Sequence, residues 1–172
     1  MAKMQKIERG QLADLQKQYE AERMQCQWIK VGMGTGGRAA GAEPLFLKLR
    51  EAVRREDLDI DVRQTGSIGL CWAEPLVEVK LDGMSPVMYG NVDEDGVTRI
   101  FNEHVMGKKI VEDLRVPGVE TLGFDKQVLG DLEPASKQHR IVLRNCGVID
   151  PASLEDYIAR GGYQALEKAL FE

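Results

Sequence analysis

The sequence predicts an α/β protein, because its central part alternates strand-like and helix-like segments in the order β-α-β followed by β-β-α. Two observations carry this prediction. Leu45, Leu49 and Val53 recur at helical spacing behind a glycine-rich stretch. Two apolar runs separated by an Asp-Gly turn are typical of a β-hairpin. The expected strands are 28–31, 58–62, 76–81 and 87–92, and the expected helices are 44–55 and 93–106.

Over residues 28–107 this order is that of the thioredoxin-like fold, with a parallel strand pair, an antiparallel hairpin and helices on both faces of the sheet. The rest of the chain is expected to form extensions of this domain. The expected segments are an N-terminal amphipathic helix within 1–27, the domain at 28–107, a linker at 108–138 with a short helical piece at 109–114, and a C-terminal segment at 139–172 with a strand at 139–145 and helices at 154–159 and 163–171.

Composition excludes several classes of function. The chain has 172 residues, is 43% hydrophobic and carries a net charge of −5, which fits a folded soluble protein and not a nucleic-acid binder. Its apolar runs are too short for a membrane-spanning helix, and no secretory signal is visible. An odd number of cysteines, three, indicates reduced thiols, so we expect a cytoplasmic protein. Two histidines exclude a histidine-rich metal site.

The glycine motif Gly32-x-Gly34-x-x-Gly37 lies between an expected strand and an expected helix, like a dinucleotide-binding fingerprint. Two features count against that interpretation. Pro44 places the expected helix start well beyond the last glycine, and a hairpin stands where a third β-α-β strand should follow. A glycine loop that bends tightly beside another loop is favoured, and a small nucleotide-binding module stays as an alternative.

The remaining polar residues predict no catalytic constellation. Cys71 follows Ser67 in a glycine-flanked loop, where a small buried thiol is the ordinary interpretation. Cys146 is also expected to be a small packed residue, and His104 is expected at the surface. His139 has no partner at catalytic or metal-binding spacing. The acidic pairs in the chain resemble first-turn helix residues and not acid–base dyads.

Two stretches of the sequence carry a family resemblance, IKVGMGTGGRAAGA and RQTGSIGLCWAEPLVEV. Together they resemble the thioredoxin-like [2Fe–2S] ferredoxin domain at the N-terminus of NADH-binding flavoprotein subunits. Such subunits occur in bifurcating and NAD-reducing hydrogenases, formate dehydrogenases and respiratory complex I. A third stretch, RIVLRNCGVIDPASLEDYIARGGYQALEKAL, resembles the connector that leads into the flavin domain of these subunits.

The resemblance implies a cluster site that has lost its ligands. The family places cysteines as C-x4-C and C-x3-C, and the corresponding positions here are Gly32, Gly37, Ser67 and Cys71. Three of these four positions hold no cysteine, so no cluster, no other cofactor and no metal are expected on this chain. We further expect that restoring cysteine at the three positions would permit cluster reconstitution, because the spacing is intact.

The resemblance implies a non-catalytic accessory or assembly subunit of a multi-subunit NAD(P)H-linked redox complex. FMN, NADH and iron–sulfur clusters would then belong to partner chains, such as a flavoprotein or iron–sulfur subunit. Segments 5–27 and 139–171 are expected to form the partner interface, and a homo-oligomer is a further option. The alternative is the N-terminal part of a split or truncated NADH:acceptor oxidoreductase flavoprotein subunit that contributes to an enzyme on other chains.

Overall fold

The computed structural model describes residues 10–117, 120–122, 126–128 and 140–172, with side chains described outside 120–128. The chain forms two compact units, which are treated separately below. One comprises Cys26–Asp150, and the other joins the N-terminal residues to Pro151–Glu172. In the part of the chain that the structure describes, no helix is both long and apolar enough to cross a membrane.

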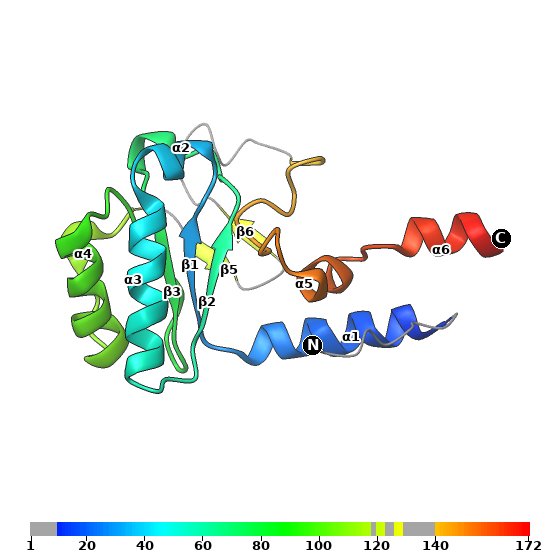
Figure 1. Cartoon of the computed structure of the whole chain (residues 1–172), viewed down its shortest axis with the longest axis horizontal. Helices are drawn as coiled ribbons and strands as arrows, with labels where there is room; N and C mark the ends of the chain where they lie inside the picture. The colour runs from blue at the N-terminus through cyan, green and yellow to red at the C-terminus, as the bar shows by residue number, and fades with distance from the viewer. Residues whose placement is uncertain (1–9, 118–119, 123–125, 129–139) are drawn as a thin grey trace. The chain divides into compact units, whose positions relative to one another are not determined.

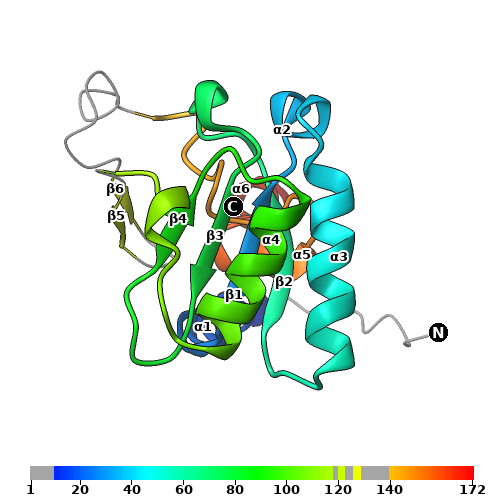
Figure 2. The same ribbon diagram turned by 90° about the vertical axis from the view of Figure 1, so that its left-hand side faces the viewer.

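A four-stranded sheet in the order β2-β1-β3-β4 forms the centre of the larger unit (Figures 1 and 2). β1 pairs in parallel with β2 and antiparallel with β3, and β3 forms a hairpin with β4. The β-α-β, β-β-α order of the thioredoxin-like fold is therefore confirmed. The strands are β1 at Trp28–Gly32, β2 at Asp61–Thr65, β3 at Val77–Lys80 and β4 at Val87–Tyr89. β2 begins later than expected, because residues 58–60 lead into the strand without pairing.

The glycine-rich stretch contains a helix that the sequence did not predict. α2 covers Thr35–Ala39, and α3 covers Ala42–Arg55, so α3 begins before Pro44. Gly41 separates the two helices with φ +95°, a left-handed conformation that glycine adopts without the strain of a side chain. Near the end of the domain, α4 covers Glu94–Arg99 and continues as a π-helix over Ile100–Met106.

Both long helices of the larger unit, α3 and α4, lie on the same face of the sheet, as the two views show (Figures 1 and 2). The expectation of helices on both faces is therefore wrong. The sheet residues on this face are apolar, and they pack against the inward sides of the two helices. This core includes Ile29, Val31, Val77, Val79, Leu45, Leu49, Val97 and Ile100.

The opposite face of the sheet is polar and yet buried. Lys30 on β1 and Glu78 on β3 are register partners, each is 3% exposed, and their side chains form an ion pair of 3.4 Å. The Lys30 ammonium also lies 3.9 Å from the centroid of the Trp28 ring and donates to the Gly147 carbonyl at 3.3 Å. The segment around Gly147 thus takes the place that a second helical layer was expected to fill.

Residues 108–117, expected to begin a linker, belong to the core of the larger unit. Val111 and Val116 are buried, and the Val116 amide donates to the Met88 carbonyl on β4. Of the expected helical piece at 109–114, only a 3-10 turn at Glu112–Leu114 forms. Beyond it lie β5 at Glu120–Leu122 and β6 at Lys126–Val128, which form a two-stranded sheet. Residues 129–138 of the expected linker lie outside the described residues, as does His139.

The expected strand at 139–145 does not form, and residues 141–148 make successive turns. Ile141, Val142 and Leu143 are exposed there, so their apolar sequence reflects no strand pairing. The two expected C-terminal helices are present as α5 at Leu154–Ala159 and α6 at Gln164–Phe171.

In the smaller unit, α1 at Gln11–Gln25 packs against α5. Arg23 forms an ion pair of 2.5 Å with the buried carboxylate of Asp156. Ser153 caps α5 by accepting a hydrogen bond from the Asp156 amide at 3.1 Å. Residues 1–9, which include the start of the expected helix, lie outside the described residues.

Candidate functional site

The two loops that carry the family's ligand positions lie together at the carboxyl ends of β1 and β2. A Cβ atom on Gly34 in the first loop would stand 2.9 Å from the Cβ of Ser67 in the second. Real Cβ atoms essentially never come this close, so glycine is required at position 34. This confirms the interpretation of the glycine motif as a loop that bends tightly beside another loop.

The first two ligand positions differ sharply in the space that they offer. A Cβ on Gly32 would make an ordinary contact of 3.5 Å with Leu76. A Cβ on Gly37 would overlap the backbone carbonyl oxygen of Gly32 and lie 2.9 Å from Oε2 of Glu74. A backbone oxygen cannot turn aside as a flexible side chain can, so position 37 has no room for a cysteine in this conformation.

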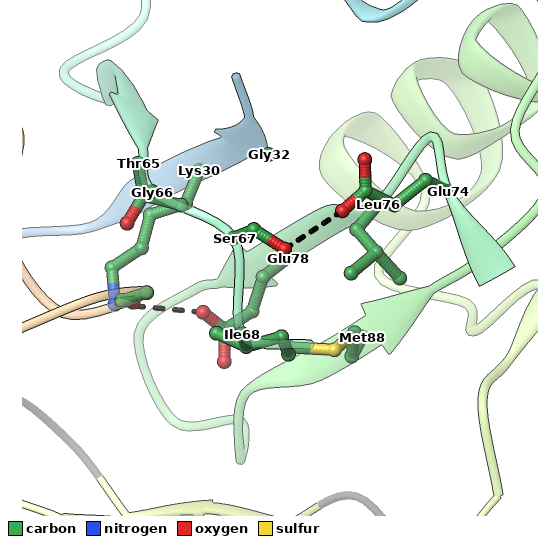
Figure 3. A pocket seen from close by; sticks show the side chains of 11 residues that line it. Lys30, Gly32, Thr65, Gly66, Ser67, Ile68, Glu74, Leu76, Glu78 and Met88 are labelled. Atoms are coloured by element: carbon green, nitrogen blue, oxygen red, sulfur yellow. Dashed lines mark hydrogen bonds and ion pairs between the residues drawn. The ribbon is translucent and has the colours of Figure 1, made fainter. Parts of the chain in front are cut away.

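Ser67, at the third ligand position, is engaged in a hydrogen bond. Its hydroxyl donates to Oε1 of Glu74 at 3.0 Å and accepts from the Gly69 amide at 3.2 Å (Figure 3). Glu74 is buried, and its other oxygen, Oε2, points toward Gly36 and Gly37 without a hydrogen-bond partner among the described residues. The Glu74 carboxylate therefore lies beside the space into which a side chain at position 37 would extend.

A small cavity of about 20 Å³ lies next to this pair, between the second loop and the polar face of the sheet (Figure 3). That volume holds about one water molecule. Lys30 and Glu78 line it, together with Thr65. Oγ1 of Thr65 and Oε1 of Glu78 are buried without a partner in the described part of the chain. The cavity is too small for a nucleotide or a flavin.

The cysteines do not converge on the ligand loops. Cys71, at the fourth ligand position, is exposed on a 3-10 turn at Cys71–Ala73. Cys146 lies beside Gly66 and is half-buried, so it is only partly the packed residue that we expected. Cys26 accepts a hydrogen bond of 3.0 Å from Arg63 at the other end of the sheet. Within the described ranges, no three His, Cys, Asp or Glu side chains are grouped to hold a metal. A [2Fe–2S] cluster takes four ligands, and of the four ligand positions only Cys71 carries a thiol, so this donor set does not fit the cluster.

Comparison with known proteins shows the family of this chain. The chain is 30% identical over 102 residues to the NADP-reducing hydrogenase subunit HndB of Solidesulfovibrio fructosivorans, a match that covers 59% of this chain and 77% of HndB. The chain belongs to the HndB family.

Other comparisons match smaller parts of the chain. A 34-residue stretch, 20% of this chain, is 62% identical to the NADP-reducing hydrogenase subunit HndC of the same organism, but it covers only 7% of HndC. Two crystal structures of a thioredoxin-like [2Fe–2S] ferredoxin from Aquifex aeolicus are also similar. Their TM-scores are 0.46 and 0.47 at 22% and 24% identity, and each match covers 53% of this chain and 90% or 96% of the ferredoxin. No family model matches the chain.

One histidine of this HndB-family chain lies in the core, so the expectation that His104 is at the surface is wrong. His104 is fully buried, and its Nδ1 lies 2.7 Å from the hydroxyl of Tyr89. Because the Tyr89 oxygen accepts from the Val111 amide at 3.4 Å, we assign its proton to the bond with Nδ1. The proton of a neutral His104 then resides on Nε2, which is buried without a partner in the described residues. Burial lowers the pKa of His104, with the nearby Lys108 adding to the effect, and burial raises the pKa of Tyr89 to about 12.

A signal for His104 was present in the sequence. Val97, Phe101, His104 and Val105 share one helical face, and the apolar members of this face are buried. No comparable signal pointed to Glu74. Its role depends on the approach of two loops that come from different strands, which spacing along the chain does not reveal.

Proposed function

We propose that this HndB-family chain is a non-catalytic accessory or assembly subunit of a multi-subunit NAD(P)H-linked redox complex, and that it holds no iron–sulfur cluster. Membership of a family of hydrogenase subunits supports the placement in a redox complex. FMN, NADH and the clusters would be bound by partner chains. The chain would contribute contacts and not electron-carrying groups.

The observation that carries this proposal is the state of the ligand loops. Ser67 and Glu74 form a hydrogen-bonded pair at the third ligand position, and Gly37 has no space for a side chain. A buried carboxylate and a close backbone contact occupy the space that ligands at these positions would need. This supports a fold that serves purposes other than cluster binding.

The C-terminal segment supports a docking role. α6 has no buried residue, and Leu166, Leu170 and Phe171 on it are half or more exposed. The expectation that all of 5–27 and 139–171 meets a partner needs revision, because Leu12 and Ile158 are already buried and α1 packs against α5. We propose that α6 is the part of these segments that contacts a partner subunit.

A second candidate function rests on the similarity to HndC. The stretch that is 62% identical to HndC over 34 residues supports the alternative function. In this alternative, the chain is the N-terminal part of a split or truncated flavoprotein subunit. Such a chain would complete an oxidoreductase whose flavin half lies on another polypeptide.

Co-expression distinguishes these two functions. The genes adjacent to that of this chain are expressed together, with and without it, and the products are weighed by native mass spectrometry and assayed for NAD(P)H oxidation. An accessory subunit should raise the yield of assembled complex and leave the activity per bound flavin unchanged. If the assembled complex instead loses its activity per flavin without this chain, the split-enzyme function is correct and the accessory function is wrong.

A further inference from the structure

The strand β2 leaves one edge of the sheet open. In the described part of the chain, β2 pairs only with β1, whereas the other edge strand, β4, is bridged by Arg115. Asp61 donates to the Gln27 carbonyl, and Thr65 accepts from the Met33 amide. Because successive residues of a strand point their backbone groups to opposite sides, those of Val62 and Gln64 point away from β1. These groups are free to pair with an added strand.

A groove runs along this open edge, between β2 and the exposed side of α3. Its volume is about 750 Å³, and its apolar lining includes Leu47, Ile60 and Val62. Leu47 is 56% exposed, so its side chain is available to a ligand in the groove. The groove lies entirely within the larger unit.

The groove carries more basic than acidic side chains when those already paired within the protein are left out. Asp61 is paired with Arg63 at 2.8 Å, and Arg55 is paired with Glu56 at 3.0 Å. Among the described residues, the Arg54 side chain has no ion pair or hydrogen bond, and the Arg50 guanidinium lies 5.5 Å from the centroid of the Phe46 ring. Glu51 also lines the groove and carries a negative charge beside these two arginines. A basic site is complementary to an acidic ligand, and two copies of this groove facing each other would repel.

The spacing of the two arginines matches an extended ligand. Arg50 and Arg54 are four residues apart on α3, and four residues rise about 6 Å along a helix. Alternate residues of a strand lie about 6.6 Å apart on one face. Two acidic side chains separated by one residue on an added strand would therefore meet the two arginines, and a further apolar residue would reach Leu47.

We propose that the groove between α3 and β2 binds an extended acidic segment of a partner protein, which adds to the sheet as a strand beside β2. The backbone of Val62 and Gln64 supplies the hydrogen bonds of strand addition. Arg50 and Arg54 select a segment in which two acidic residues are separated by one residue. This inference concerns a different surface from α6 and does not depend on the absence of a cluster.

The test uses the full chain and two synthetic peptides, acetyl-Thr-Val-Glu-Val-Glu-Val-Thr-amide and the same peptide with Lys in place of Glu. Binding is followed by NMR titration of the ¹⁵N-labelled protein. We expect saturable chemical-shift changes for residues of β2 and α3 with the Glu peptide and none with the Lys peptide. Binding of the Glu peptide should weaken as the salt concentration is raised. The double variant Arg50→Glu/Arg54→Glu should weaken binding about tenfold or more, since two exposed ion pairs are lost and replaced by repulsion. The double variant Arg38→Glu/Lys48→Glu carries the same change of charge outside the groove and should bind normally.

Val62→Pro provides an independent test, because proline removes the outward amide of β2 without changing any charge. It should abolish binding of the Glu peptide. If this variant fails to fold, the surface arginine variants still decide the question. The proposal is overturned if the Glu peptide shows no saturable shifts up to about 1 mM, a concentration that detects even weak complexes. Equal binding of the two peptides, or dimerisation of the protein through β2, would also overturn it.

Discussion

Gly37 and Gly32 are in such close contact that a Cβ atom on Gly37 would overlap the carbonyl oxygen of Gly32. Gly32 ends β1, and Gly37 lies in α2, so the contact holds α2 tightly against the end of the strand. These are two of the four positions at which the family that the sequence resembles places cysteines, and the contact leaves no space for a side chain at position 37.

The first prediction compares alanine at these two glycines. Gly37→Ala should lower the free energy of unfolding by about 1–3 kcal/mol, because overpacking against backbone forces α2 to move. This loss should appear even though alanine favours helix by about 1 kcal/mol over glycine. Gly32→Ala is the matched control, with a nearest contact of 3.5 Å, and should change stability little. Urea unfolding measures both, and equal effects at the two positions would contradict the prediction.

The second prediction concerns the restoration of cysteine at Gly32, Gly37 and Ser67. From the intact spacing alone, this variant was expected to accept a cluster. The structure indicates the opposite for the loop as folded, because position 37 has no room and Glu74 lies 2.9 Å from the new Cβ. Anaerobic reconstitution should therefore leave the folded triple variant without a visible [2Fe–2S] spectrum. A stoichiometric cluster would show that α2 can move aside.

The third prediction tests the bond between Ser67 and Glu74. Ser67→Ala removes the donor to a buried carboxylate and should cost about 1–3 kcal/mol of stability. Glu74→Leu removes the acceptor, so the double variant Ser67→Ala/Glu74→Leu should lose less stability than the sum of the two single losses. Urea unfolding of the four proteins in this cycle gives the coupling energy. Strict additivity would show that the two side chains do not interact.

The fourth prediction concerns the buried ion pair on the polar face of the sheet. Lys30→Met leaves the Glu78 carboxylate buried without its cation and should cost about 3–5 kcal/mol. Replacing both members, with Lys30→Met and Glu78→Leu together, should recover most of that loss, because no buried charge is then left unpaired. Thermal unfolding of the single and double variants checks this. A double variant as unstable as the single one would contradict it.

The fifth prediction is a loss of stability in mild acid. Burial, together with Lys108, lowers the pKa of His104 in the folded protein, whereas the unfolded chain has a histidine pKa near 6.5. Below that pH the unfolded state binds more protons than the folded state, so acid favours unfolding. The contribution of His104 is fully present above pH 6.5 and declines as pH falls toward the folded pKa. Its slope reaches at most about 1.4 kcal/mol per pH unit.

The variant His104→Phe isolates this effect, because phenylalanine fills the buried site without a titrating group. Urea unfolding of both proteins between about pH 8 and pH 5 gives the two stability profiles. The difference between the profiles should be constant in the neutral range and should change only on the acid side. Parallel profiles throughout would show that His104 is not responsible.

The fold was largely predictable from the sequence, because its signals are local. The hairpin of β3 and β4 follows from apolar runs around Asp82-Gly83, and α5 follows from the capping residue Ser153. The errors arose where tertiary contacts override local pattern. The run at 141–143 looks like a strand but finds no neighbouring strand, and Val111 looks like part of a linker but is buried in the core.

The candidate site was predictable in its residues and not in its geometry. The four ligand positions are implied by the family resemblance, and the structure brings their loops together through Gly34 and Ser67. That Glu74 would bond to Ser67 and lie toward Gly37 could not be foreseen, because it depends on how two loops approach in space. Likewise the ion pair of Lys30 and Glu78 follows only from strand register.

The central proposal is that the chain is a non-catalytic subunit of a redox complex and carries no iron–sulfur cluster. The most direct test is to purify the chain anaerobically from cells that express the rest of the complex, and to measure iron, acid-labile sulfide and the visible spectrum. We predict no stoichiometric iron or sulfide and no [2Fe–2S] absorption bands for this chain, both alone and after separation from its partners. Two irons and two sulfides per chain with those bands would contradict the account, because they would require the loops of Gly37 and Ser67 to hold what their geometry excludes.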